Sequence, residues 1–194
     1  MSIRVMSGAA RGRWLRATPE GYEVRPILNR IRKSLFDILR PRIREALFLD
    51  LYAGTGAVGI EALSEGARKV VFVDENPSSI KMVEKNVQAL NFSDRAEILL
   101  GDATKSLVWL AREKFDIIFL GPPYKDAQKK PLTLSAKTLN RIVEAGLLKP
   151  GGMVVAQRFI KEPLEGLDPR WDRYRENKYG DSVLSFFRLK EASL

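Results

Sequence analysis

The stretch that decides the fold is Leu47–Glu61, LFLDLYAGTGAVGIE. Four of its first five residues are apolar, which is typical of a buried parallel strand. Gly54, Gly56 and Gly59 follow and let the backbone turn tightly, and a helix is predicted to begin at Ile60. The stretch therefore predicts a strand, a glycine loop and a helix, the unit from which open α/β sheets are built.

A glycine loop before a helix offers backbone N–H groups and close backbone approach to a ligand. This loop also fits the dinucleotide fingerprint G-x-G-x-x-G, with Asp74 near the distance expected of a ribose-binding acid. Asp50, inside the strand, decides between ligands, because its carboxylate repels a pyrophosphate and suits an ammonium and a sulfonium. We therefore predict S-adenosylmethionine (SAM) over a nicotinamide or a flavin. Glycines that merely allow helix–sheet packing would explain Gly59, but not three glycines preceded by an acid.

The block D-x-x-x-G-x-G-x-x-G, from Asp50 to Gly59, resembles motif I of the class I SAM-dependent methyltransferases. The chain contains no cysteine and no histidine, which excludes thiolate nucleophiles, disulfides, histidine bases and Cys/His metal sites. We therefore expect no metal centre. Methylation of a base at ring C5, which normally uses a thiolate, is also disfavoured.

Positive charge is concentrated at the start of the chain. The net charge is +9, and residues 1–44 hold eleven basic residues and three acids, so residues 45–194 are close to neutral. We expect two parts: a basic extension over 1–44 that contacts nucleic acid, and a methyltransferase domain over 45–194. No apolar run is long enough to span a bilayer, and Met1–Ala10 lacks the apolar core of a signal peptide. We expect a cytoplasmic protein with no membrane partner.

The basic extension is predicted to contain a hairpin and a helix. Strand-like runs at 3–6 and 14–17 flank a glycine-containing loop, although a frayed basic tail is the alternative. A helix is predicted from Arg25-Pro26 to about Leu39, with Pro41 ending it. Its apolar stripe is Ile27, Ile31, Leu35 and Ile38. The candidate RNA-binding residues are Arg4, Arg11, Arg13, Arg25, Arg30, Arg32 and Lys33. A basic helix face that is merely solvated remains the alternative.

The rest of the chain alternates strand-like and helix-like segments. Strands are predicted at 69–74, 96–100, 115–120 and 153–157, helices at 77–90, 104–111 and 133–145, a turn at 149–152 and an antiparallel hairpin at 171–178 and 183–189. This order predicts a Rossmann-like α/β fold: a seven-stranded, mostly parallel sheet closed by an antiparallel hairpin.

Ligands of such sheets bind at the carboxyl ends of the strands. Asp74 is therefore expected to accept from both ribose hydroxyls, and Asp102 from the adenine amino group beside the Ala103 backbone. A helix N-cap is the alternative for Asp102. The candidate cofactor-binding residues are Asp50, Tyr52, Ala53, Gly54, Thr55, Gly56, Asp74, Glu75, Asp102 and Ala103.

Gly121-Pro122-Pro123-Tyr124 follows the predicted strand 115–120 and is the candidate catalytic loop. It resembles the [D/N/S]-P-P-[Y/F] motif of methyltransferases that act on exocyclic amino groups of bases. Such an amine is a poor nucleophile, so acceptors for its N–H groups and an aromatic face must aim it. The Pro122 carbonyl is one acceptor, and Tyr124 is expected to stack on the base. Gly121 departs from the motif because it has no side-chain acceptor. A water with the carbonyl, a substitute such as Asp126, or impaired catalysis are the open explanations.

Further motifs are similar to those of the bacterial 16S rRNA guanine-N2 methyltransferases, the RsmD family. They are Arg4-Val5-x-Ser7-Gly8, Arg11-Gly12-Arg13-x-Leu15, Arg25-Pro26-x-x-x-Arg30-Ile31-Arg32 and Asp50-Leu51-Tyr52-Ala53-Gly54-Thr55-Gly56. Ile27 and Asn29 stand where the family commonly has Thr and Asp. The resemblance implies methyl transfer from SAM to the 2-amino group of a guanine in 16S rRNA of the small ribosomal subunit, and we expect a monomer. The alternatives are an adenine or cytosine amino group, a SAM- and rRNA-binding assembly factor impaired by Gly121, or, more distantly, a nicotinamide oxidoreductase.

Overall fold

The computed structural model describes residues 3–16, 27–126 and 128–190. The chain divides into two compact units, Met1–Asp102 and Ala103–Leu194. The predicted division after residue 44 falls inside the first unit, because the basic extension packs onto the elements that carry the glycine loop. Of the helices in the described ranges, none has the length and apolar character that crossing a membrane requires.

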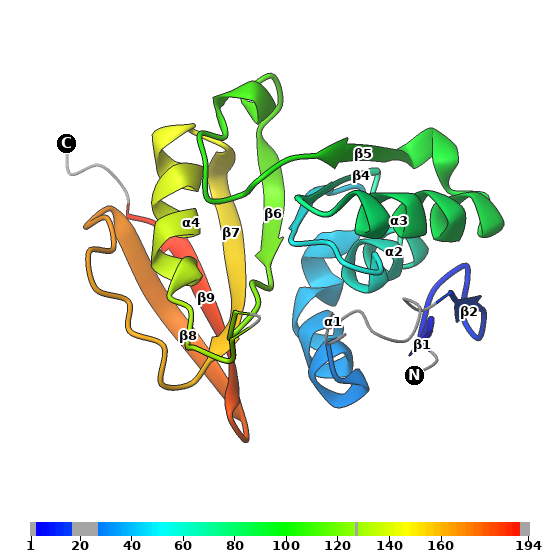
Figure 1. Ribbon diagram of the computed structural model, residues 1–194. Helices are drawn as coiled ribbons and strands as arrows, with labels where there is room; N and C mark the ends of the chain where they lie inside the picture. The colour runs from blue at the N-terminus through cyan, green and yellow to red at the C-terminus, as the bar shows by residue number, and fades with distance from the viewer. Residues whose placement is uncertain (1–2, 17–26, 127, 191–194) are drawn as a thin grey trace. The chain divides into compact units, whose positions relative to one another are not determined.

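The first unit contains three parallel strands in the order β5-β4-β3. These strands are β3 (Leu47–Leu51), β4 (Lys69–Asp74) and β5 (Ala96–Leu100). Every residue of β3 is buried, as its apolar run predicts. Helix α2 (Ala57–Ser64) follows β3, and α3 (Pro77–Ala89) follows β4 (Figure 1). A short 3₁₀ turn, η1 (Ser93–Arg95), leads into β5.

The predicted hairpin is present near the start of the chain. Strands β1 (Ile3–Arg4) and β2 (Trp14–Leu15) pair antiparallel, with Ile3 opposite Leu15. The pairing rules out a frayed tail for these residues. The Ala9 amide donates to the Ser64 carbonyl at 2.8 Å, so the hairpin loop is fixed to the end of α2.

The helix of the extension, α1, spans Asn29–Ile43 and differs from the prediction at both ends. Arg25 and Pro26 lie outside the described residues, and the extended conformation of Leu28 shows that the helix begins after it. Pro41 does not end the helix but lies in its last turn. The apolar stripe continues at i+4 spacing through Leu39 to Ile43, and both are buried. That burial holds the last turn although proline removes one backbone hydrogen bond.

The second unit contains four strands in the order β6-β7-β9-β8. β6 (Phe115–Leu120) pairs parallel with β7 (Leu148–Phe159), and β9 (Ser182–Leu189) pairs antiparallel with both β7 and β8 (Trp171–Tyr179). Helix α4 (Leu134–Glu144) precedes β7 (Figure 1). The two units therefore supply seven strands with the predicted closing hairpin, and the fold is the Rossmann-like methyltransferase fold.

Two local predictions in the second unit were wrong. Residues 104–111 form only a 3₁₀ turn, η2 (Val108–Leu110). Within this stretch only Leu107 and Leu110 are buried, so a full helix would have little apolar surface to pack against the rest of the unit. The predicted turn at 149–152 is an irregularity inside β7, where the register against β6 jumps from Leu148 to Met153. Gly151, with φ of 71°, permits this jump.

Candidate active site

The glycine loop between β3 and α2 has an unusual backbone. Gly54 and Gly56 have φ of 57° and 78°, in the left-handed region that favours glycine. Tyr52 also has a positive φ, 65°, which costs a non-glycine residue roughly 1–3 kcal/mol. Gly59 serves packing, since a Cβ there would lie 2.2 Å from the Phe72 ring. Two of the three glycines therefore shape the loop, and the third lets α2 approach β4.

Asp50 lies beneath this loop, and its side chain is 1% exposed. Its Oδ2 accepts a hydrogen bond of 2.8 Å from the Gly59 amide, so Asp50 satisfies one of the free N–H groups in the first turn of α2. Burial raises the pKa of Asp50 to about 7; the hydrogen bond from Gly59 lowers it, and the charge of Asp74 raises it further. The carboxylate is therefore only partly ionised at neutral pH, and a nearby cation would hold it in the charged form.

Asp74, at the carboxyl end of β4, fixes the loop from the other side. Its Oδ2 accepts from the Gly54 amide at 2.8 Å, and its Oδ1 accepts from the Asn76 amide at 2.9 Å. Each oxygen keeps a second lone pair for a ligand hydroxyl. The side chain of Asn76 in turn caps α3 by accepting from the Ser78 amide.

The remaining cofactor candidates differ in exposure. Glu75 is exposed and Asp102 is half-buried, whereas Ala103 is 4% exposed. The first unit ends at Asp102 and the second begins at Ala103. Because residues 104–111 do not form a helix, the N-cap alternative for Asp102 loses its helix.

The Pro-Pro-Tyr loop follows β6 in the second unit. Pro122 is buried, Pro123 is exposed, and the Tyr124 ring is half-buried. The Tyr124 hydroxyl donates to Ser182 Oγ at 3.1 Å and accepts from Gln157 Nε2 at 3.2 Å. The Phe159 ring lies 6.0 Å from the Tyr124 ring, centroid to centroid. The aromatic ring is therefore fixed in place by three contacts.

Gly121 and Asp126 bear on the missing side-chain acceptor. The Asp126 carboxylate accepts from the Lys130 amide at 2.8 Å, so one of its oxygens already stabilises the turn that contains it. A Cβ at Gly121 would meet only the tip of the Phe119 ring, at 3.2 and 3.4 Å, and Gly121 has no positive φ. A side chain at this position therefore requires the Phe119 ring to shift by a few tenths of an ångström, and neither a positive φ nor a backbone clash requires glycine here.

The RNA-binding candidates are exposed, with one correction. Arg4, Arg11, Arg13, Arg30 and Lys33 are exposed, and Arg25 lies outside the described residues. The prediction for Arg32 was wrong, because its side chain is fully buried.

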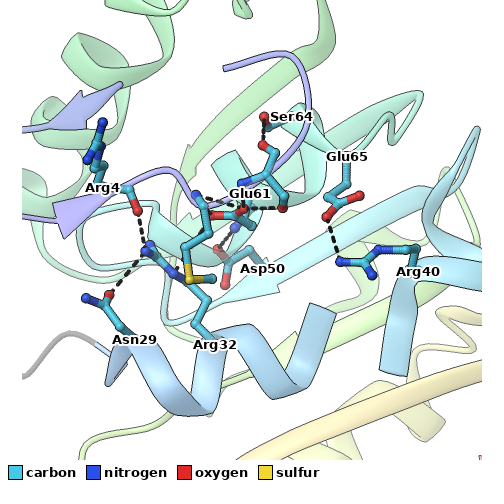
Figure 2. A network of polar contacts seen from close by, with 11 residues as sticks. Arg4, Asn29, Arg32, Arg40, Asp50, Glu61, Ser64 and Glu65 are labelled. Atoms are coloured by element: carbon cyan, nitrogen blue, oxygen red, sulfur yellow. Dashed lines mark hydrogen bonds and ion pairs between the residues drawn. The ribbon is translucent and has the colours of Figure 1, made fainter. Parts of the chain in front are cut away.

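Arg32 is instead part of a buried network in the first unit. It donates to the Arg4 carbonyl and lies 3.9 Å from the buried Glu61 (Figure 2). Burial lowers the pKa of Arg32, and the Glu61 charge raises it. Glu61 accepts from the Met6 amide and from the Ser7 amide and hydroxyl, so it joins the basic extension to α2. The sequence signal for this partner is Glu61 itself, a charged residue in the mainly apolar α2.

Comparison with known proteins identifies the family. The family model described as "Conserved hypothetical protein 95" matches residues 3–188. Ribosomal RNA small subunit methyltransferase D of Haemophilus influenzae is 32% identical over 84% of this chain and 81% of its own. The Escherichia coli protein of the same name is 28% identical over 96% of this chain and 89% of its own. The chain belongs to the RsmD family.

Solved structures confirm the fold of this RsmD-family chain. The structure of yhhF from Escherichia coli has a TM-score of 0.80 at 26% identity and covers 98% of this chain and 99% of that chain. A Thermus thermophilus structure titled 16S rRNA N2 G1207 methyltransferase, in complex with AdoMet and guanosine, has a TM-score of 0.74. It is 23% identical and covers 98% of this chain and 50% of that chain, a likeness of fold.

The cofactor of the RsmD-family chain is S-adenosylmethionine, and the residues of the first unit fit it. Asp50 and Asp74 place two carboxylates against one loop, and mutual repulsion contributes to the raised pKa of Asp50. A cationic ligand relieves that repulsion, whereas a pyrophosphate adds to it. This donor set therefore favours SAM, as Asp50 predicted from the sequence.

Proposed function

We propose that this chain methylates the exocyclic 2-amino group of a guanine in 16S rRNA, acting on the small ribosomal subunit. The observation that carries the proposal is the Pro-Pro-Tyr loop after β6, whose Tyr124 ring is held by Ser182, Gln157 and Phe159. A fixed aromatic face suits a base turned out of its helix, since stacking orients the ring plane. The relatives named ribosomal RNA small subunit methyltransferase D support rRNA as the substrate.

The residues of the two loops have separate tasks in this proposal. SAM supplies an activated methyl group on a sulfonium. Asp50, ionised beside the cationic ligand, balances its positive charge, and Asp74 accepts from the ribose hydroxyls. The Pro122 carbonyl accepts from one N–H of the guanine amino group, and Tyr124 holds the base plane. Orientation of this kind contributes several kcal/mol to a transfer that needs no strong base.

Two alternatives stand beside guanine N2. The first is an adenine or cytosine amino group, because the Pro-Pro-Tyr loop suits any exocyclic amine. The second is a SAM- and rRNA-binding assembly factor, which Gly121 favours because it lacks the side-chain acceptor of the motif. Losing one charge-assisted hydrogen bond costs about 1.5–3 kcal/mol, roughly ten- to hundredfold in rate.

The test is transfer of radiolabelled methyl from SAM to small subunits and, in parallel, to naked 16S rRNA. The rRNA comes from a strain that lacks the corresponding activity, and the product is digested to nucleosides. We expect label in N2-methylguanosine. Label in a methylated adenosine or cytidine would support the first alternative. SAM binding without transfer to either substrate would support the assembly factor and contradict the proposal.

A further inference from the structure

Trp14 is an exposed aromatic residue on the described hairpin. It lies on β2, and 62% of it is exposed. The Arg4 guanidinium lies over its ring, 5.5 Å from the centroid. Leu15, the next residue, is buried and holds the strand in place. The hairpin therefore presents a large flat ring to solvent with a cation over one of its faces, the combination that stacks nucleobases.

A concavity of about 260 Å³ is lined by Arg16, which comes two residues after Trp14, and by Lys85, Gln88 and Ala89 of α3. This lining contains two cations and no acid. Arg16 and Lys85 are both exposed, and no described residue forms an ion pair with either side chain. The concavity therefore offers positive charge that the rest of the described chain leaves unbalanced, and an anion such as a phosphate fits it.

Asn86 and Arg13 fix the concavity to the hairpin. Asn86, only 2% exposed, accepts from the Arg16 amide at 2.8 Å and donates to the Arg16 carbonyl at 3.1 Å. It also donates to the Thr55 carbonyl in the glycine loop at 3.0 Å. Arg13 donates to the Ala89 carbonyl at the end of α3, at 3.1 Å. The segment that carries Trp14 and Arg16 is thus hydrogen-bonded to α3, the helix that carries Lys85.

We propose that Trp14, Arg16 and Lys85 form a platform for a single-stranded segment of the RNA substrate. One base stacks on the Trp14 ring, and Arg16 and Lys85 hold an adjacent phosphate in the concavity. This inference rests on the proposed function in one respect, that the substrate is RNA. An acidic peptide is disfavoured, because it would use the cations but leave the exposed ring without a partner.

The stacking half is tested with full-length protein and a fluorescein-labelled single-stranded RNA of about 12 nucleotides. Trp14→Ala is expected to weaken binding about 5- to 100-fold, and Trp14→Phe to retain most of it. Trp109→Ala, at a tryptophan that is 45% exposed, is the control and is expected to bind as the parent does. Equal affinity of Trp14→Ala and the parent would overturn the stacking role.

The phosphate half is tested by salt dependence. The double variant Arg16→Gln/Lys85→Gln is expected to reduce the slope of log K against log salt by about 0.7, the value for one phosphate of a single strand. Lys81→Gln, at another exposed lysine of α3, is expected to leave the slope unchanged. An unchanged slope in the double variant would overturn the phosphate role.

Methyl transfer separates failure of the platform from failure of the proposed function. With 16S rRNA as substrate, Trp14→Ala is expected to raise KM at least fivefold while kcat and SAM affinity stay at the parent values. Product formation with an unchanged KM would overturn the platform and leave the proposed function standing. No product from the parent protein would contradict the proposed function, and the binding measurements would still decide the platform.

Discussion

Asp50→Asn is expected to remove a loss of stability that the cofactor-free protein suffers as the pH rises, and to weaken SAM binding. The Asp50 carboxyl is buried, and burial raises its pKa from 3.8 to about 7. The native protein therefore keeps a proton that the unfolded chain releases between about pH 4 and pH 7. The stability associated with that proton is complete below about pH 4 and is lost as the pH rises through about 7. Asparagine does not ionise, so the variant escapes the loss.

The size of the effect follows from the pKa shift. A shift of roughly 3 units, at about 1.36 kcal/mol each, corresponds to a loss of about 4 kcal/mol in the free energy of unfolding. Asparagine can still accept from the Gly59 amide, and any fixed cost of its buried NH₂ group applies at every pH. The quantity to measure is therefore the change with pH of the difference between variant and parent.

Urea unfolding at several pH values between 4 and 8 measures this difference, and calorimetric titration with SAM at pH 8 gives the affinity. We expect the difference in free energy of unfolding to move by about 4 kcal/mol in favour of Asp50→Asn across that range. We expect SAM to bind about 10- to 100-fold more weakly, the cost of losing a charged partner. Asp94→Asn, at an exposed acid of the same unit, is the control. A difference that stays constant with pH would refute the reasoning.

Substitutions at three further positions test the catalytic loop and the packing of α2. Gly121→Asp is expected to raise the methyl-transfer rate about 10-fold or more, because it supplies a charged side-chain acceptor; a rate equal to that of Gly121→Ala, whose Cβ meets the same Phe119 ring, would show that another acceptor is in use. Tyr124→Ala is expected to lower kcat/KM for rRNA about 10- to 100-fold and Tyr124→Phe less than tenfold, since the phenyl ring still stacks; equal losses would place the effect in the hydroxyl. Gly59→Ala is expected to lower the free energy of unfolding by about 1–3 kcal/mol in urea titrations, because its Cβ overlaps the Phe72 ring; an unchanged midpoint would contradict the packing role.

The strands β3, β4, β5 and β6 were predictable because each is a short apolar run. The run at Phe115–Leu120 is buried along almost all of its length, charged residues precede it and Gly121 follows it, and the predicted and observed limits agree. The glycine loop was also predictable, since few other local structures use three closely spaced glycines after a strand. The partner of Asp50 was not predictable, because its hydrogen bond to Gly59 depends on how α2 returns over β3.

The burial of Arg32 could not be predicted from the pattern of its own helix. On the helix surface it flanks a basic face, and charge alone predicts exposure. Its burial depends on Glu61, which lies 29 residues later and approaches it only in the folded unit. The helix predicted at 104–111 was wrong for the opposite reason. Its residues are compatible with a helix, but few of them are buried in the folded unit. Whether a charged side chain is buried, and whether a short segment forms a helix, both depend on neighbours that are distant in the sequence.

The measurement that tests the central claim most directly is identification of the atom that receives the methyl group. The protein is incubated with SAM carrying a ¹³C-methyl group and with 16S rRNA whose guanines carry ¹⁵N at the 2-amino position, and the isolated nucleoside is examined by NMR. We predict a one-bond coupling between the methyl carbon and the labelled nitrogen. A methylated nucleoside without that coupling would show that the methyl group went to another atom and would contradict the assignment to guanine N2.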